Sequence, residues 1–327
     1  MKVLLTGASG FVGSHILDTL CERGIPTAVL LRPTSQRNFI ERQLQRVEVR
    51  LGSIDDPASL HEALREVTHI IHCAGATKAL RAAEFYEVNQ TGTRNVVEAV
   101  NAQRGQVQRL VHISSLAAAG PALPGQPARE SDPPQPVSEY GRSKLAGERE
   151  VTGQCQADFV VLRPPAVYGP RDGEFLRLFK AVKSHLRPRF GGGRQALSFV
   201  FVKDLADTAV AVLTAPAAAR QTYFVAAQEI ATARELTEEI AVQMGVWTLP
   251  LPLPTALLWP VCAVQELLSR LTGKPNVLSR QKYAELRAPA WTCDASKLRR
   301  ELGLECRTNL KAGLGTTQSW YREQGWL

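Results

Sequence analysis

The feature that most constrains the fold is a glycine-rich turn close to the amino terminus. An apolar run at residues 3–5 leads into residues 6–13, Thr-Gly-Ala-Ser-Gly-Phe-Val-Gly, and a helical pattern follows. Glycines let the backbone approach a pyrophosphate closely, and the amides and dipole at the start of a helix favour its negative charge. This order of strand, turn and helix predicts a dinucleotide-binding unit. Its expected cofactor contacts are Gly7, Ser9, Gly10, Phe11, Val12 and Gly13.

The chain then continues to alternate between strand and helix patterns. Short apolar runs at residues 27–31, 47–51, 69–72, 110–113 and 159–162 are typical of strands buried on both faces. Helical patterns at residues 13–23, 57–66, 84–104 and 139–154 separate them. The alternation predicts an α/β protein with a Rossmann-type, doubly wound parallel sheet. A strand at residues 199–202, a helix at 204–214 and a strand at 222–225 are expected to return to that sheet.

Glycine and proline clusters after Arg163 indicate loops at the carboxyl edge of the sheet, where substrates bind. We therefore predict two parts. Residues 1–165 with 197–226 form the NAD(P)-binding Rossmann domain, and residues 166–196 with 227–327 form a smaller C-terminal substrate-binding lobe.

The charge and cysteine content of the chain limit the kinds of partner that it is expected to bind. The net charge of +8 is scattered among acidic and apolar residues, which argues against a nucleic-acid partner. Six cysteines without a C-x-x-C pair indicate neither a metal site nor a disulfide framework. The first predicted strand leaves no room for a signal peptide before it, so we expect a cytoplasmic protein.

The most apolar long stretch, residues 246–264, is interrupted by Pro250, Pro252, Pro254 and Pro260, which argues against an integral membrane helix. A packed core segment, a lid and a membrane-surface contact remain open for it.

The end of the second predicted strand bears on the choice of cofactor. An acidic residue at this position would hold the ribose hydroxyls of NAD, but the chain has Arg32 there. A guanidinium cannot accept those hydrogen bonds, whereas it pairs well with a 2′-phosphate. The sequence thus favours NADP over NAD, unless Arg32 points to solvent.

Tyr140 and Lys144 stand four residues apart on one face of a predicted helix. A free tyrosine titrates near pH 10, so a nearby positive charge is needed to stabilise its phenolate at neutral pH. The fifth predicted strand ends in Ser114-Ser115, which brings two hydroxyls to the carboxyl edge. These residues predict a proton-transfer site in which Tyr140 acts as general acid or base.

Four motifs together resemble the extended (atypical) short-chain dehydrogenase/reductase superfamily, of the NAD-dependent epimerase/dehydratase type. They are the glycine turn, Ser114-Ser115, Tyr140-x-x-x-Lys144 and the Arg-Pro-Pro-Ala-Val-Tyr-Gly-Pro run at 163–170. The resemblance covers essentially the whole chain. It implies a catalytic set of Ser115, Tyr140 and Lys144, with Ser115 the more natural match than Ser114, and it implies a homodimer through the helices at 84–104 and 139–154.

The resemblance also implies further site residues. Cys73, Ala74 and Gly75 would line the cofactor, as would Tyr140, Lys144, Pro164 and Val167, while Asn89 and Thr93 would be structural. Ser53 and Ile54 would lie at the adenine, although Ser53 stands where the family often has an aspartate. The expected substrate contacts are Lys78, Ser115, Tyr168 and Arg194.

The residues of the substrate lobe distinguish between the reactions that members of this superfamily catalyse. Residues 196–199 are Ala-Leu-Ser-Phe where nucleotide-sugar enzymes commonly carry a diphosphate-binding arginine. The chain looks most like the 3-beta-hydroxysteroid dehydrogenase and dihydroflavonol reductase branch, which implies hydride exchange between nicotinamide and a secondary alcohol or ketone on a bulky hydrophobic, steroid-, terpenoid- or flavonoid-like molecule. A nucleotide-sugar epimerase or dehydratase is the alternative, and a noncatalytic cofactor sensor is a third reading. Apolar residues that suit such a substrate, or that form core, are Leu249, Leu251, Leu253, Leu257, Leu258, Trp259 and Leu267.

Overall fold

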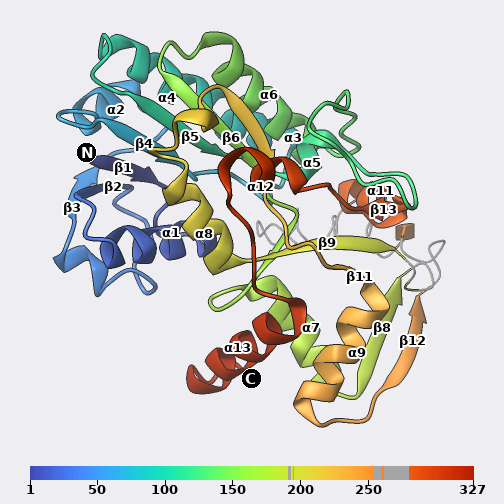
Figure 1. Ribbon diagram of the computed structural model, residues 1–327. Coiled ribbons are helices and arrows are strands. Elements are labelled where there is room, and N and C mark those ends of the chain that lie inside the picture. Colours follow the sequence, from blue (N-terminus) through green and yellow to red (C-terminus); the bar gives the residue numbers. More distant parts are fainter. Residues whose placement is uncertain (191–192, 194, 254–258, 261–279) are drawn as a thin grey trace.

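A computed structural model describes residues 1–190, 193, 195–253, 259–260 and 280–327 of the chain. Its centre is a seven-stranded parallel sheet in the order β10-β6-β5-β4-β1-β2-β3 (Figure 1). The strand order reverses between β1 and β4, as in a doubly wound Rossmann fold, so the predicted fold class is confirmed. The strands are β1 (Val3–Thr6), β2 (Thr27–Leu31), β3 (Glu48–Leu51), β4 (His69–His72), β5 (Arg109–Ile113), β6 (Asp158–Arg163) and β10 (Gln221–Phe224).

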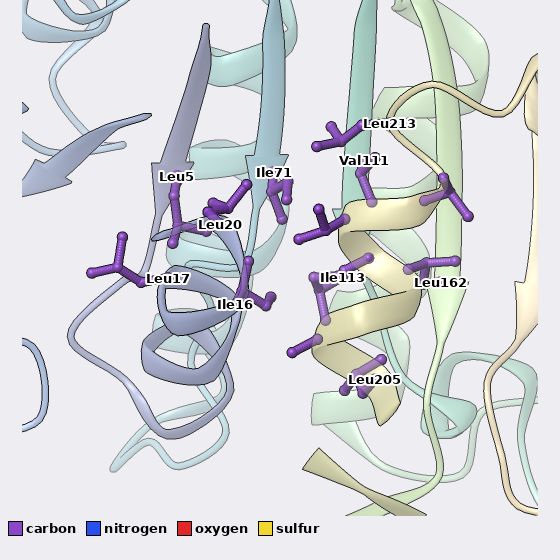
Figure 2. Packing of buried hydrophobic residues seen from close by; sticks show 14 of the residues in the cluster. Leu5, Ile16, Leu17, Leu20, Ile71, Val111, Ile113, Leu162, Leu205 and Leu213 are labelled. Carbon is purple, nitrogen blue, oxygen red and sulfur yellow. The ribbon is translucent and has the colours of Figure 1, made fainter. Parts of the chain in front are cut away.

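Helices cover both faces of this sheet (Figure 1). On one face α1 (Phe11–Glu22) packs beside α8 (Val202–Ala211), and Figure 2 shows Ile16, Leu20 and Leu205 of these helices among the buried side chains of the strands. The other face is covered by α2 (Pro57–Ala63), α4 (Gly92–Ala102) and α6 (Glu139–Gln154). Two apolar cores therefore hold the central sheet in place and fix its carboxyl edge.

The predicted helix at 84–104 is not continuous. It consists of α3 (Ala82–Tyr86), a π-helical turn (Glu87–Thr91) and α4. Single π-helical turns within helices occur frequently at functional sites. Here the turn contains Asn89, whose side chain makes contacts described below.

The smaller lobe is built on a second sheet, in which β9 (Ala196–Phe201) pairs with β7 (Ala166–Tyr168), β11 (Ile230–Thr232) and β13 (Ala290–Trp291). The expectation that the strand at 199–202 returns to the nucleotide-binding sheet was therefore wrong. Phe199 and Phe201 pack against Tyr168 in the core of this lobe, whereas the following helix α8 and strand β10 do return to the large sheet.

Around this sheet lie α7 (Gly173–Lys183), α9 (Ala233–Met244) and α13 (Leu310–Glu323), and β8 (Leu186–Phe190) pairs with β12 (Leu249–Leu253) at the tip of the lobe (Figure 1). In the part of the chain that the structure describes, no helix is long and apolar enough to cross a bilayer. The other elements among the described residues are α5 (Leu116–Ala119), α11 (Arg280–Arg287), α12 (Ser296–Leu302) and 3-10 turns at Gln43–Gln45 and Pro216–Ala218.

A further correction concerns β3, which was expected to be buried on both faces. It is an edge strand, and Val49 and Leu51 are exposed. Of the apolar stretch at 246–264, residues 254–258 and 261–264 lie outside the described residues, as do Arg194 and Leu267.

Candidate active site

The glycine turn leaves space for a phosphate. Gly7 has a φ of +74°, and a Cβ at Gly13 would lie 2.0 Å from the carbonyl oxygen of Gly7. Helix α1 starts at Phe11 with Gly10 as its N-cap, no side chain caps it, and its first turn contains no acidic residue. Its first amides and positive dipole end can therefore take an anion. The turn fits the pyrophosphate of a dinucleotide, and Ser9 and Val12, both partly buried, belong to it.

A buried chain of hydrogen bonds fixes the segment after β4. The Oγ1 of Thr6 lies 2.8 Å from Nδ1 of His72, and Nε2 of His72 lies 3.1 Å from Oγ1 of Thr93. The amide of Ala74 donates to the same Thr6 hydroxyl at 3.2 Å. These contacts place Cys73, Ala74 and Gly75 beside the glycine turn, where a Cβ at Gly7 would lie 2.6 Å from the nitrogen of Ala74.

Asn89 links this segment to the helix that carries Tyr140. Its Nδ2 donates to the carbonyl of Ala76 at 3.0 Å and to the Ser143 hydroxyl at 2.9 Å, while its Oδ1 accepts from the amide of Ala76 at 2.8 Å. The Ser143 hydroxyl in turn donates to the carbonyl of Tyr140. Asn89 and Thr93 thus have the structural roles that the resemblance implied, and the π-helical turn lets Asn89 reach both partners.

Lys144 is buried one helical turn after Tyr140. Its ammonium donates to the carbonyl of Ile113, the last residue of β5, at 2.7 Å. Burial lowers the pKa of Lys144 to about 8. Lys144 is thereby fixed between α6 and the carboxyl edge of the sheet.

Tyr140 stays protonated at neutral pH. Burial raises the pKa of Tyr140 to about 12, a hydrogen bond with Ser115 lowers it in part, and the charge of Glu285 raises it. The Ser115 hydroxyl also accepts from the amide of Ala117 at 3.1 Å, because Ser115 is the N-cap of α5. The structure brings Ser115, Tyr140 and Lys144 together at the end of β5.

The neighbouring Ser114 does not share this arrangement, because its hydroxyl bonds to a different residue. Its buried hydroxyl donates to the Glu148 carboxylate, which also binds the Arg163 guanidinium through two hydrogen bonds of 2.9 and 2.6 Å. This geometry favours Ser115 over Ser114 as the serine that faces a reacting oxygen.

Glu285 is a site residue that sequence reasoning missed. Its carboxylate accepts a 2.7 Å hydrogen bond from Ser138, the N-cap of α6, two residues before Tyr140. Glu285 belongs to α11 of the smaller lobe, 145 positions after Tyr140 along the chain. Because no local motif joins the two segments, no sequence signal could have found this contact.

Arg32 is exposed directly after β2, where its amide donates to the Ser35 hydroxyl at 3.1 Å. On the neighbouring segment, a hydrogen bond with Ser53 lowers the pKa of Asp55, and the positive charge of Arg32 contributes. Arg32 and Ser53 therefore occupy the same end of the candidate dinucleotide site. Ile54 packs under α4, where a Cβ at Gly92 would lie 2.6 Å from its Cδ1.

Of the residues predicted to contact nicotinamide or substrate, some lie at the site and others do not. Pro164 is buried and its carbonyl accepts from the amide of Leu116, which brings it next to Ser115, and Val167 is half-buried in β7. Tyr168 is 1% exposed and its hydroxyl donates to the carbonyl of Asn309, so it is a core residue and not an exposed substrate contact. Lys78 forms an ion pair with Glu174, and Arg194 lies outside the described residues.

A doubly wound sheet, an uncapped glycine turn and a serine, tyrosine and lysine at one strand end define a nicotinamide-dependent enzyme of the extended short-chain dehydrogenase/reductase type. The family model for the NAD dependent epimerase/dehydratase family matches residues 3–226. The chain belongs to this family.

The individual relatives include both a reductase and an epimerase. The chain is 31% identical to a ceramide reductase of Caulobacter vibrioides, over 99% of this chain and 96% of the relative. It is 27% identical to a UDP-glucose 4-epimerase of Vibrio cholerae, over 85% of this chain and 84% of the relative. Among solved structures, that of gox2253 superimposes with a TM-score of 0.82 at 26% identity, over 100% of this chain and 99% of that one.

Proposed function

We propose that this enzyme transfers hydride between NADP and a secondary alcohol or ketone on a bulky, apolar, lipid-like molecule, with Tyr140 as the general acid or base. The observation that carries the proposal is the grouping of Tyr140, Ser115 and buried Lys144 at the carboxyl edge, beside the glycine turn. Bound nicotinamide would supply or accept the hydride.

The protonation states favour reduction at neutral pH. With a pKa of about 12, Tyr140 keeps its proton and can donate it to the carbonyl oxygen as the hydride adds to the carbonyl carbon. The carbonyl π electrons go to the oxygen and the ketone becomes an alcohol, with the hydride that a bound reduced nicotinamide would supply. Lys144, with a pKa of about 8, is largely cationic at neutral pH and stabilises the phenolate that remains. Ser115 would hydrogen-bond the reacting oxygen.

The apolar substrate class has two supports. Strand β9 begins with Ala196 and Leu197 where a diphosphate-binding arginine is common in nucleotide-sugar enzymes, and one relative that aligns over nearly the full length of both chains is named a ceramide reductase. A nucleotide-sugar epimerase is the second candidate, since the Vibrio relative has that name. We further propose that the protein acts as a homodimer in the cytoplasm.

The two candidates differ in what happens to the cofactor. A reductase consumes external NADPH in each cycle, whereas an epimerase retains its cofactor through turnover. Purified protein should therefore oxidise NADPH with a ketone on a long-chain amide and not with UDP-galactose. Tyr140→Phe should reduce the turnover about 10²- to 10⁴-fold with NADPH affinity unchanged. Conversion of UDP-galactose without added cofactor would move the assignment to the epimerase.

A further inference from the structure

The two-stranded sheet at the tip of the smaller lobe has an apolar face. In the parallel pairing of β8 with β12, Leu186 lies beside Leu249 and Pro188 beside Leu251. Alternate residues of a strand point to the same face, so these four side chains share one face. Leu186, Leu249 and Leu251 are 42%, 59% and 42% exposed. We call Leu186, Pro188, Leu249 and Leu251 the outer ribbon face.

The opposite face of the ribbon is covered. Arg187 and Arg189 alternate with the outer residues of β8, and their guanidinium groups lie 2.6 and 3.5 Å from the Glu238 carboxylate of α9. The ribbon is thus attached to the lobe by its polar face and presents its leucines outward. Neighbouring exposed leucines on a folded protein are a mark of an interaction site.

Helix α7, which contacts β8, has exposed positive charges. Residues 175–189 and 244–253 contain no aspartate or glutamate. Of their five lysine and arginine residues, Arg187 and Arg189 pair with Glu238, and Arg177, Lys180 and Lys183 are exposed on α7, the helix that leads into β8. A surface with negative charge would complement the three exposed cations of α7.

An exposed tryptophan borders the same face. Trp247 is 66% exposed, stands two residues before Leu249 and stacks on His185 with ring centroids 4.2 Å apart. Tryptophan, leucine and basic side chains together are the composition of segments that lie in the headgroup region of a membrane. The combination selects a lipid surface among the possible partners.

We propose that the outer ribbon face docks the smaller lobe on a bilayer that contains anionic lipids. The leucines and Trp247 enter the boundary between headgroups and acyl chains, and the exposed cations of α7 pair with the headgroup phosphates. This proposal rests on the proposed function for its purpose, because an apolar substrate partitions into the bilayer and docking brings the substrate lobe to it.

The test is co-sedimentation of the full chain with vesicles of phosphatidylcholine that do or do not contain phosphatidylglycerol. Wild-type protein should sediment with the anionic vesicles, and the double variant Leu249→Glu/Leu251→Glu should bind at least about tenfold more weakly, because it replaces apolar contacts with repelled charges. Leu51→Glu is the matched control, since Leu51 is 62% exposed on β3 of the other domain and its substitution should leave vesicle binding unchanged.

Wild-type protein that stays in solution with anionic vesicles would overturn the proposal, as would equal binding by the double variant. Dimerisation that the double variant abolishes would assign the face to a second copy instead. Turnover of a short, water-soluble ketone by the same samples separates the two hypotheses. Normal turnover without vesicle binding refutes the docking alone, and vesicle binding without NADPH-dependent turnover refutes the proposed function alone.

Discussion

Burial has a larger effect on the pKa values of Tyr140 and Lys144 than the interaction between the two side chains has. Burial raises the pKa of Tyr140 and lowers that of Lys144, so each side chain is pushed toward its neutral form. The Lys144 ammonium is held by the Ile113 carbonyl and not by the tyrosine itself. In the proposed mechanism Lys144 acts on Tyr140 through its charge, and with a pKa of about 8 it loses that charge at higher pH.

This leads to a prediction for the pH dependence of reduction. Lys144 is cationic below its pKa of about 8 and neutral above it, so the cation that stabilises the phenolate disappears as the pH rises. The turnover number for ketone reduction should be level below pH 8 and fall up to about tenfold per pH unit above it. Lys183→Arg, at an exposed lysine of α7, should leave the profile unchanged. A profile level to pH 10 would contradict the role of Lys144.

Arg32 carries the prediction for cofactor choice. If its guanidinium pairs with the 2′-phosphate, Arg32→Ala should weaken NADPH binding about tenfold or more and leave NADH binding nearly unchanged. Fluorescence titrations of the two cofactors measure both constants. Arg65→Ala, at an exposed arginine just after α2, is the control. Equal losses of affinity for both cofactors would mean that Arg32 does not bind the 2′-phosphate.

At the scale of elements, one buried network attaches α6 to the sheet. Glu148 of α6 receives hydrogen bonds from Ser114, directly after β5, and from Arg163 at the end of β6. Glu148 is 4% and Arg163 7% exposed, so water cannot replace either partner. The network sets the position of the helix that bears Tyr140 and Lys144.

Breaking this network should cost much stability. Glu148→Gln leaves the Arg163 charge buried without its counter-ion, and we expect a loss of about 3–5 kcal/mol in the free energy of unfolding. Arg94→Gln breaks the partly exposed Arg94–Glu150 ion pair and should cost less than about 1 kcal/mol. Urea unfolding of the two variants compares them directly. Similar small losses would show that the buried pair is not what anchors α6.

Local patterns predicted the elements of the large sheet well and those of the smaller lobe less well. The bounds of α6 and of β2 and β4 were predicted to the residue, because apolar runs and caps mark them in the sequence. The π-helical turn at Asn89 and the placement of β9 in the second sheet depend on contacts with distant segments. Glu285 reaches the site for the same reason, and a local pattern has no information about such contacts.

For the whole molecule, two buried histidines link stability to pH. Burial lowers the pKa of His72 to about 3 and that of His112 well below its ordinary value. Below about pH 6.5 the unfolded chain takes up protons on these imidazoles while the folded chain does not, so stability falls as the pH falls. The rings of the two histidines lie 5.3 Å apart, at the ends of β4 and β5.

His112→Leu should reduce this acid sensitivity. Neither ring nitrogen of His112 has a hydrogen-bond partner among the described residues, so the substitution removes a titrating group without breaking a protein contact. The fall in melting temperature between pH 7 and pH 5 should be smaller in His112→Leu than in wild type. His61→Leu, at an exposed histidine, should behave like wild type.

The central claim is that this enzyme passes hydride between an exchangeable nicotinamide and a ketone, with Tyr140 supplying the proton. The most direct test is a single turnover with NADPH deuterated at the transferred position and a ketone on a long-chain amide. The account predicts deuterium on the product's carbinol carbon, release of NADP, and loss of both in Tyr140→Phe. Deuterium that never leaves the protein-bound cofactor, while a nucleotide sugar is epimerised, would contradict it.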